Sequence, residues 1–263
     1  MSIVHVSTWD EFVANVNSAN DIIIDADLDA SGWSSYTLNL GSGTTFIDGQ
    51  GHEIRNISYS HSGNLFYTNA SGSKTFKNIN FVNIMGTTTS DNAFFHGYYG
   101  TIYITDCKFQ GRVFNFAYRA VNCTRCTFAF EPGLAYLFWT STGTQLWDEC
   151  YIDFKTQTTN ALPPVAGIES TKFKDCYFKG TIRTSSNMFN ATLQNCVINV
   201  FTAPTSSSFA FVSMGSITSQ SLYNADRITG SATITAQTRL TGLSDSDLKS
   251  EAAVVATGFP LVT

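Results

Sequence analysis

The sequence predicts an all-β protein in which parallel strands stack into a solenoid. Three observations predict this fold: a repeated six-residue phrase, cysteines that occur in phase with that phrase, and a low content of charged residues. The phrase reads apolar, polar, Asx, Cys, polar, aromatic, as at residues 104–109 and 173–178. Repetition every few tens of residues is typical of chains built from stacked structural units.

Further copies of the phrase occur at residues 76–81, 123–128, 147–152 and 193–198, with a glycine-substituted copy at residues 46–51. Their fourth positions follow one another at intervals of 30, 28, 19, 24, 26 and 20 residues. An irregular period in this range indicates coils whose strands are fixed while the connecting loops vary in length.

The phrase itself predicts a strand, a one-residue corner and a second strand. Positions four and six lie on one face of a strand, because successive side chains point to opposite faces. Positions one and four are three apart, so the chain must bend at position three if all apolar positions point inward. Asx residues tolerate the left-handed backbone of such a bend. They occupy position three as Asp48, Asn78, Asp106, Asp175 and Asn195.

The six cysteines are predicted to be buried thiols. Cys123 occupies position one of its copy. The other five occupy position four: Cys107, Cys126, Cys150, Cys176 and Cys196. Thiols act as small hydrophobic groups in such an inward stack. An even number of cysteines also permits disulfides. Cys123-x-x-Cys126 is half of a zinc-binding pattern, but no second pair follows it.

We expect one domain, residues 1–263, that starts with a capping helix within residues 1–20. Thr8 and Glu11 match a capping box, in which each side chain bonds the other residue's backbone amide. The apolar residues that follow lie on one helical face. They are Trp9, Phe12, Val13 and Val16. Such a helix covers the open first coil of a solenoid, whose strand edge would otherwise recruit other chains.

The solenoid is expected to occupy residues 21–240, followed by a C-terminal helix and tail at residues 241–263. Ser244 and Asp247 predict the start of a helix that runs to about Ala256. Leu248, Ala252 and Val255 would either close the far end of the solenoid or dock the helix on its flank.

A second set of apolar residues lies between the copies of the phrase and predicts a third strand in each coil. It comprises residues 65–66, 94–95, 113–114, 137–138 and 188–189, together with Phe209 and Phe211. Residues 83–92 and 155–167 are predicted to be the longest loops. Loops on a rigid scaffold are where a binding function is expected.

Composition restricts the possible partners. Charged residues make up 13% of the chain, aromatic residues 14%, and the formal net charge is −5. Scattered Lys and Arg argue against a nucleic-acid surface, which needs clustered basic residues. The sequence shows neither a membrane-spanning segment nor a signal peptide. We therefore expect a protein made in the bacterial cytoplasm with reduced thiols, and no cofactor or metal.

The phrase pattern and the Ile-Asp-Gly-Gln-Gly-His stretch at residues 47–52 resemble the right-handed parallel β-helix superfamily. This superfamily includes pectate lyases, polygalacturonases and phage tailspikes. The resemblance covers residues 22–198 and implies a right-handed, single-stranded parallel β-helix. It specifies architecture well and function poorly.

Catalytic motifs of that superfamily have no match in the sequence. The Asn-Thr-Asp, Asp-Asp and Gly-His-Gly signatures of polygalacturonases are missing, and Phe95-His96-Gly97 is the nearest stretch. Carboxylates from different coils can still converge as a glycosidase pair. The densest acidic group, Asp148, Glu149 and Asp153, is the candidate for this alternative. The positions of Asp148 and Glu149 in the repeat favour a solvated surface instead.

Aromatic residues near small polar residues are the candidate ligand contacts. Tyr98 and Tyr99 lie between two glycines, beside His96, while Trp33 and Trp139 lie near Ser, Thr and Gly. Such rings can stack on sugars or anchor a protein partner. Packing within the core or between coils is the alternative for each of them.

Two functional hypotheses follow. The first is a phage or prophage virion structural or adhesion protein without catalytic activity: a tail spike, a fibre or a capsid-associated protein. It would contact other virion proteins or a cell-surface glycan as a homo-oligomer, with a trimer favoured by resemblance to tailspikes. Residues 243–260 also resemble the ends of prophage structural proteins. The second hypothesis is a polysaccharide lyase or glycoside hydrolase.

Overall fold

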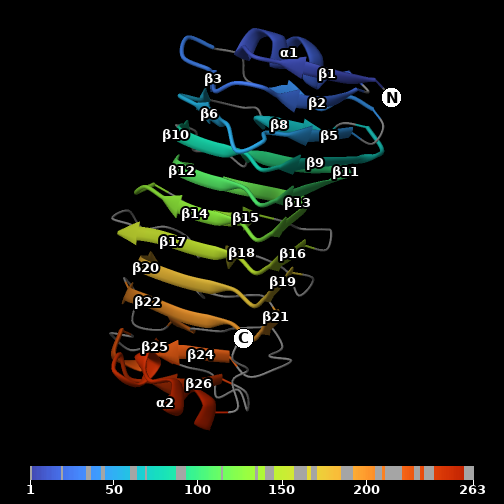
Figure 1. The fold of residues 1–263 in the computed structure, drawn as a ribbon. Coiled ribbons are helices and arrows are strands. Elements are labelled where there is room, and N and C mark those ends of the chain that lie inside the picture. The colour runs from blue at the N-terminus through green and yellow to red at the C-terminus, as the bar shows by residue number, and fades with distance from the viewer. Residues whose placement is uncertain are drawn as a thin grey trace.

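The computed structural model shows an elongated, all-β stack of parallel strands with a short helix at each end (Figure 1). Every pairing between described strands is parallel, and the arrangement is that of a parallel β-helix-like solenoid. The structure describes residues 2–18, 20–33, 37–42, 45–59, 64–68, 70–86, 93–113, 115–133, 136–139, 145–156, 165–166, 171–184, 192–204, 209–210, 221–227, 232–233 and 240–257.

The first large sheet contains the strands that precede the predicted corners. Its main path is β1 (Ile3–Val6), β2 (Asp21–Ile24), β5 (Thr45–Asp48), β9 (Ser73–Lys77), β11 (Phe95–Thr105), β13 (Asn115–Thr124), β16 (Gln145–Asp148), β19 (Thr171–Lys174) and β21 (Thr192–Gln194). A branch of this sheet carries β4 (Leu38–Asn39), β8 (Phe66–Thr68), β15 (Tyr136–Trp139) and β18 (Val165–Ala166).

The second large sheet contains the strands that follow the corners. Its path in chain order is β3 (Leu28–Asp29), β6 (Glu53–Arg55), β10 (Asn80–Gly86), β12 (Lys108–Arg112), β14 (Thr127–Phe130), β17 (Tyr151–Thr156), β20 (Tyr177–Thr184), β22 (Val197–Pro204), β24 (Ser221–Asn224) and β26 (Leu240–Leu243). Strand β7 (Ser58–Tyr59) pairs with the end of β10. Strands β23 (Phe209–Ala210) and β25 (Ala232–Thr233) form a separate pair.

The predicted corners are confirmed in all but the first copy of the phrase. Position three has a left-handed backbone in six consecutive coils, with φ between 50° and 55° at Asn78, Asp106, Arg125, Glu149, Asp175 and Asn195. The expectation for Asp48 is wrong, because Asp48 ends β5 and the left-handed residues of that coil are Gln50 and Gly51. Glycine at positions four and six moves the bend two residues along the chain.

Side chains at several of these corners bond the neighbouring coil. Asn78 donates to Asp48 at 3.2 Å and Asn195 donates to Asp175 at 2.9 Å. Arg125 forms a bidentate pair with Asp106, at 2.7 and 2.9 Å. A polar group at the corner thus tolerates the backbone bend and also links successive coils.

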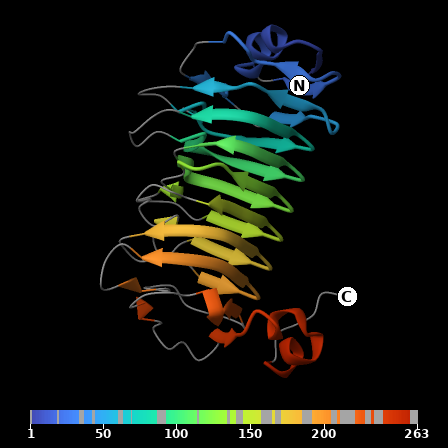
Figure 2. The same cartoon turned by 90° about the vertical axis from the view of Figure 1, so that its left-hand side faces the viewer.

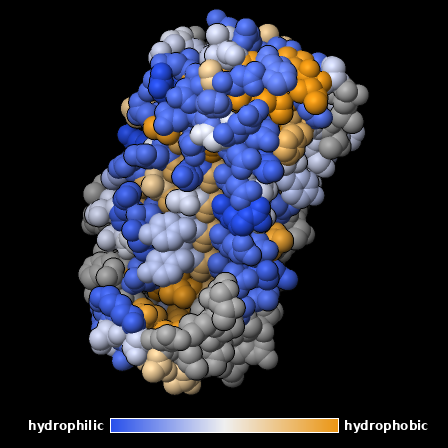
Figure 3. Space-filling model, viewed as in Figure 1, coloured by the Kyte–Doolittle hydropathy of each residue, from blue (hydrophilic) through white to orange (hydrophobic). Residues whose placement is uncertain are grey.

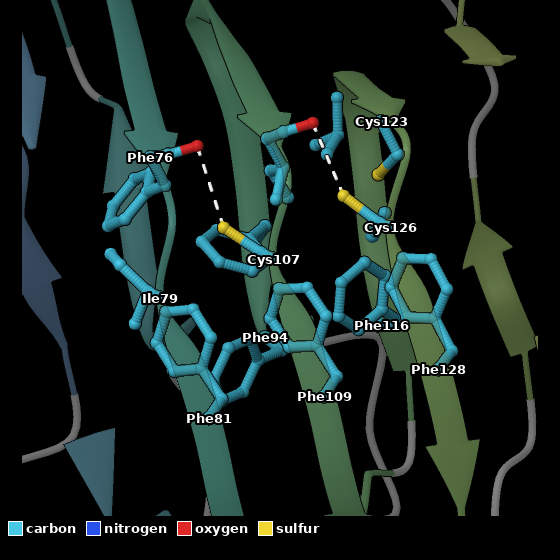
Figure 4. Packing of buried hydrophobic residues seen from close by; sticks show 14 of the residues in the cluster. Phe76, Ile79, Phe81, Phe94, Cys107, Phe109, Phe116, Cys123, Cys126 and Phe128 are labelled. Atoms are coloured by element: carbon cyan, nitrogen blue, oxygen red, sulfur yellow. Dashed lines mark hydrogen bonds between the residues drawn. The ribbon is translucent and has the colours of Figure 1, made fainter. Parts of the chain in front are cut away.

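The cysteines form the predicted inward stack, and all six are buried and free. Each position-four thiol lies against a backbone carbonyl of the preceding coil. Cys107 Sγ is 3.7 Å from the Phe76 oxygen and Cys126 Sγ is 3.5 Å from the Ile104 oxygen (Figure 4). Backbone bonds from Tyr151 to Cys126 and from Tyr177 to Cys150 keep the stack in register.

Phenylalanine rings fill the interior beside the thiols. Phe109 stacks on Phe81 with ring centroids 4.7 Å apart and on Phe128 with centroids 5.1 Å apart (Figure 4). Phe94 meets Phe81 and Phe109 edge to face, and Phe116 meets Phe109 and Phe128 in the same way. Offset and edge-to-face pairs add to the stabilisation from burial. The same position thus supplies a core ring in successive coils.

The predicted third strand is confirmed in part: β8, β11 and β15 contain Phe66, Phe95 and Phe138 and belong to the first sheet, whereas Phe209 lies in β23 of the separate pair and Val113 lies before β13. Strands β11 and β13 each run across two faces, and their register shifts between Gly97 and Ile102. The first halves pair with β8 and β15, while the second halves pair with β9 and β16. Arg119 has φ of 61° at this second bend. Residues 188–189, Phe114 and Phe211 lie outside the described residues.

The N-terminal cap is confirmed. Helix α1 (Trp9–Val16) has the full capping box between Thr8 and Glu11. Trp9, Phe12 and Val16 are buried over the first coil, and the helix lies across one end of the stack (Figures 1 and 2).

The prediction of one continuous helix at the C-terminus is wrong. A 3₁₀ helix, η2 (Asp247–Lys249), is separated from α2 (Glu251–Ala256) by Ser250, whose backbone is extended. The Ser244 hydroxyl accepts from the Asp247 amide, as a cap should. Val254, rather than Ala252, is buried. Another 3₁₀ helix, η1 (Ala225–Arg227), follows β24.

The predicted loops are only partly described. Residues 83–86 belong to β10 rather than to a loop. Residues 155–156 end β17 and residues 165–166 form β18. Residues 87–92, 157–164 and 167 lie outside the described part of the chain.

Candidate functional site

The three acidic candidates lie on either side of a corner instead of on one surface. Asp148 ends β16 in the first sheet, Asp153 lies in β17 in the second, and Glu149 occupies the corner between them with φ of 53°. Lys174 Nζ is 3.1 Å from Asp148 Oδ1. Asp148 is therefore held in an ion pair between successive coils.

Asp153 is the most buried of the three and is also ion-paired. Its Oδ2 lies 3.2 Å from Lys155 Nζ and 3.3 Å from Lys179 Nζ. Burial alone would raise its pKa, but hydrogen bonds from the Lys155 amide and from both lysine side chains lower that pKa overall. The group stays ionised near neutral pH, as a carboxylate that anchors two lysines.

Ring residues line up on the outward side of the branch of the first sheet. Strand register aligns Tyr67 of β8 with His96 of β11, His96 with Tyr118 of β13, and Tyr118 with Trp139 of β15. The His96 ring centroid is 5.1 Å from that of Tyr67 and 4.5 Å from that of Tyr118. The side chain of Trp139 lies outside the part of the chain that the structure describes.

The bend after this column adds two tyrosines and an arginine. Tyr98 and Tyr99 meet edge to face with centroids 4.4 Å apart, and Tyr98 also contacts His96 and Tyr67. The Arg119 guanidinium carbon lies 3.9 Å from the centre of the Tyr98 ring. Tyr99 is 66% exposed. We call Tyr67, His96, Tyr98, Tyr99, Tyr118 and Arg119 the aromatic patch.

His96 lies beneath the rings of this patch. It is 7% exposed, and neither of its ring nitrogens has a hydrogen-bond partner. Burial, reinforced by the nearby Arg119 charge, lowers its pKa to about 4. The imidazole is therefore neutral near pH 7, and both of its nitrogens are buried without a partner among the described residues.

The backbone at Arg119 is fixed by two neighbours. The buried Gln145 side chain donates to the Arg119 carbonyl oxygen. In the adjacent coil, Gly97 is paired with Arg119, and a Cβ at Gly97 would lie 2.4 Å from the Ala120 oxygen. Glycine is required there because the two backbones approach closely. This contact fixes the bend that presents Arg119 to Tyr98.

Trp33 lies away from the aromatic patch, at the N-terminal cap. It meets Trp9 edge to face at 5.5 Å and lines a cleft of about 550 Å³ with Asp10 and Asp29. Hydrogen bonds from Asn56 and Ser31 lower the pKa of Asp29 to about 2. This packing on the cap matches the alternative considered for Trp33.

The described residues contain no cluster of three or more His, Cys, Asp or Glu side chains suited to a metal ion. No helix among them is long and apolar enough to cross a membrane.

Sequence prediction identified His96, Tyr98 and Tyr99 in the aromatic patch and missed Tyr67, Tyr118 and Arg119. A signal existed for Tyr67, because a buried phenylalanine is followed directly by a ring of the patch in both Phe66-Tyr67 and Phe95-His96.

Comparison with known proteins supports the fold alone. No protein-family model matches the chain, and no curated protein matches it. Among solved structures, the chain is similar to a Bacteroides ovatus protein described as a "putative immunoglobulin A1 protease". The match has a TM-score of 0.55 and 15% identity, and it covers 96% of this chain and 86% of the other. The neighbour is not a phage protein, so it lends no support to a likeness to phage proteins in particular.

Proposed function

We propose that this protein is a non-catalytic structural or adhesion protein of the phage or prophage virion type, which contacts a cell-surface glycan through its aromatic patch. Its scaffold in this proposal is a closed, right-handed, single-stranded parallel β-helix. Crossover connections between parallel strands of one sheet are nearly always right-handed. Such a rod holds surface residues rigidly in place.

The exposed rings are the observation that carries the proposal. Tyr99 is 66% exposed and packs edge to face against Tyr98, while Tyr67 and Tyr118 are half-buried and contact Tyr98 and His96, respectively. Aromatic rings provide a large apolar face with little conformational freedom to lose, which suits stacking on a sugar ring. The face in Figure 3 is largely hydrophilic, with hydrophobic residues gathered at the N-terminal end and along a narrow band down its middle.

The acidic residues favour binding over catalysis. A glycosidase needs two carboxyl groups about 5–10 Å apart, one of them with a raised pKa. Asp148 and Asp153 are instead each ion-paired with lysine, and the pKa of Asp153 is lowered by its lysine partners. This pairing supports structural roles for both residues.

The proposal is tested by incubating the protein with host-wall and capsular polysaccharides. We expect binding on a glycan array, without release of unsaturated products or reducing ends. The double variant Tyr98→Ala, Tyr99→Ala should lose at least tenfold in affinity, because each stacked ring contributes about 1 kcal/mol or more. Tyr103→Ala is the matched control, since Tyr103 is an exposed tyrosine of the same strand outside the patch.

The non-catalytic proposal would be contradicted if the natural protein released product and the variant with Asp148, Glu149 and Asp153 all replaced by their amides did not. That result would establish a lyase or hydrolase. Equal loss of binding in the Tyr103→Ala control would instead remove the aromatic patch as the contact surface.

We also propose that the protein acts as a homotrimer and contacts other virion proteins. Low surface charge leaves flanks that can pack side by side around a symmetry axis. Light scattering at high protein concentration should give three times the 28.8 kDa chain mass. A stable monomer across the concentration range would refute the trimer.

A further inference from the structure

Arg119 is a cation without an anionic partner. Arg125, Lys174 and Lys179 each lie within 4 Å of a carboxylate, whereas no described carboxylate lies within that distance of Arg119. Its Nε is buried and has no acceptor. A guanidinium carries five donors in a planar fork, which matches the oxygens of a carboxylate, sulfate or phosphate. An approaching oxyanion would therefore meet the two terminal nitrogens of the guanidinium, which are not among the buried atoms as Nε is.

Arg119 gives the aromatic patch a positive charge that no described neighbour neutralises. Its guanidinium lies over Tyr98, and its carbon is 5.7 Å from the centre of the Tyr118 ring. Burial raises the pKa of the Tyr67 hydroxyl, and the buried His96 is neutral near pH 7, so neither group brings a negative charge to Arg119. Partial burial weakens solvent screening of the Arg119 charge, so an anion bound there interacts more strongly than on an open surface.

We propose that the aromatic patch recognises an acidic saccharide, with Arg119 binding its carboxylate, sulfate or phosphate group while the sugar ring stacks on Tyr98 and Tyr99. This inference rests on the proposed glycan contact and adds the chemical class of the ligand. Arg119 selects the anion and the tyrosines supply most of the contact area. His96, whose ring nitrogens are buried, packs edge to face against Tyr98 and supports the ring on which the sugar stacks.

The test uses the full chain and two forms of one ligand. Calorimetry compares a hyaluronan oligosaccharide, which carries glucuronate, with the same oligosaccharide after its carboxylates have been reduced to alcohols. We expect the acidic form to bind at least tenfold more tightly, and the preference to weaken as salt is added. A sulfated oligosaccharide and a single-stranded oligonucleotide distinguish the source of the oxyanion.

Variants assign the preference to one residue. Arg119→Gln should abolish the tenfold preference, so that the variant binds the acidic and the reduced form equally. Arg125→Gln is the matched control, because Arg125 is also an arginine at a left-handed corner but is paired with Asp106. Thermal melting of both variants verifies that they fold.

Three outcomes would overturn the inference. Equal binding of acidic and reduced oligosaccharides by the natural chain would remove the anion preference but leave the proposed glycan contact intact. A preference that survives in Arg119→Gln would assign the anion to another residue. Equally tight binding of the oligonucleotide would indicate a general anion site. By contrast, no binding to any glycan on the array would refute the proposed function itself.

Discussion

Replacing Cys150 with aspartate tests whether position four of the repeat points into the core. Its side chain is 2% exposed, and its Sγ lies 3.3 Å from the Asp148 oxygen and 3.6 Å from the Cys123 oxygen. A carboxylate in that position would face carbonyl oxygens and neighbouring thiols. An uncompensated buried charge costs about 3–5 kcal/mol. This is a large part of the roughly 5–15 kcal/mol that stabilises an ordinary domain.

The control for this perturbation is Cys150→Ala, which removes the sulfur without adding charge. We expect it to lower the free energy of unfolding by about 1–2 kcal/mol, from lost burial and a small cavity. Urea unfolding followed by tryptophan fluorescence measures both variants. Cys150→Asp should also become more stable as the pH falls below neutrality, because burial raises the pKa of the introduced carboxyl and protonation removes its charge.

A folded Cys150→Asp variant with the same urea midpoint as the natural protein would refute this reasoning. It would show that the side chain reaches solvent and that position four does not point inward. A midpoint lowered equally in both variants would show that volume matters at this position and charge does not.

Three further predictions concern the thiols, the buried histidine and the second bend. Burial raises the pKa of the Cys107 thiol to about 12. A thiol reagent at pH 8 should therefore label almost none of the six buried cysteines before denaturation and all of them afterwards. Rapid labelling of several cysteines in the folded protein would contradict the stack. The pKa of His96 is about 4 in the folded protein and about 6.5 in the unfolded chain. Between these two pH values the unfolded chain binds more protons, so the free energy of unfolding should fall as the pH is lowered from about 6.5 to about 4. His96→Phe should flatten this dependence, and an unchanged slope would show that another group causes it. Gly97→Ala should cost about 1–3 kcal/mol in thermal or urea unfolding, since its Cβ would lie 2.4 Å from the Ala120 oxygen; an unchanged midpoint would show that the coils can separate there.

Local pattern was sufficient to predict the repeating corner because the corner depends on few residues. An apolar residue, a polar residue able to bend and a small buried residue define it without reference to the rest of the chain. The pattern failed at Asp48, where Gly49 and Gly51 made another bend available. It failed again at Ser250, where an extended residue interrupts the predicted helix. Propensity alone cannot identify such a break, because tertiary contacts decide it.

The candidate site was harder to predict because its residues come from different coils. Tyr67 and Tyr118 reach His96 through strand register, and irregular coil lengths hide that register in the sequence. Tyr98 and Tyr99 were identifiable because two glycines mark their turn. Arg119 gave no local signal, since a left-handed arginine is recognised only when its neighbour Gly97 is placed.

The direction of the resolved carboxyl pKa shifts supports the proposal of binding over catalysis. A glycosidase keeps one carboxylic acid protonated near neutral pH, which requires a raised pKa. In every described carboxyl with a resolved shift the pKa is instead lowered, by hydrogen bonds or lysine and arginine partners: Glu11, Asp27, Asp29, Asp106 and Asp153. Carboxylates that are kept ionised in this way hold coils and loops together. Among the described residues, the unpaired nitrogens of Arg119 and His96 lie instead within the aromatic patch, which supports the proposal that this patch, and not the acidic residues, contacts the ligand.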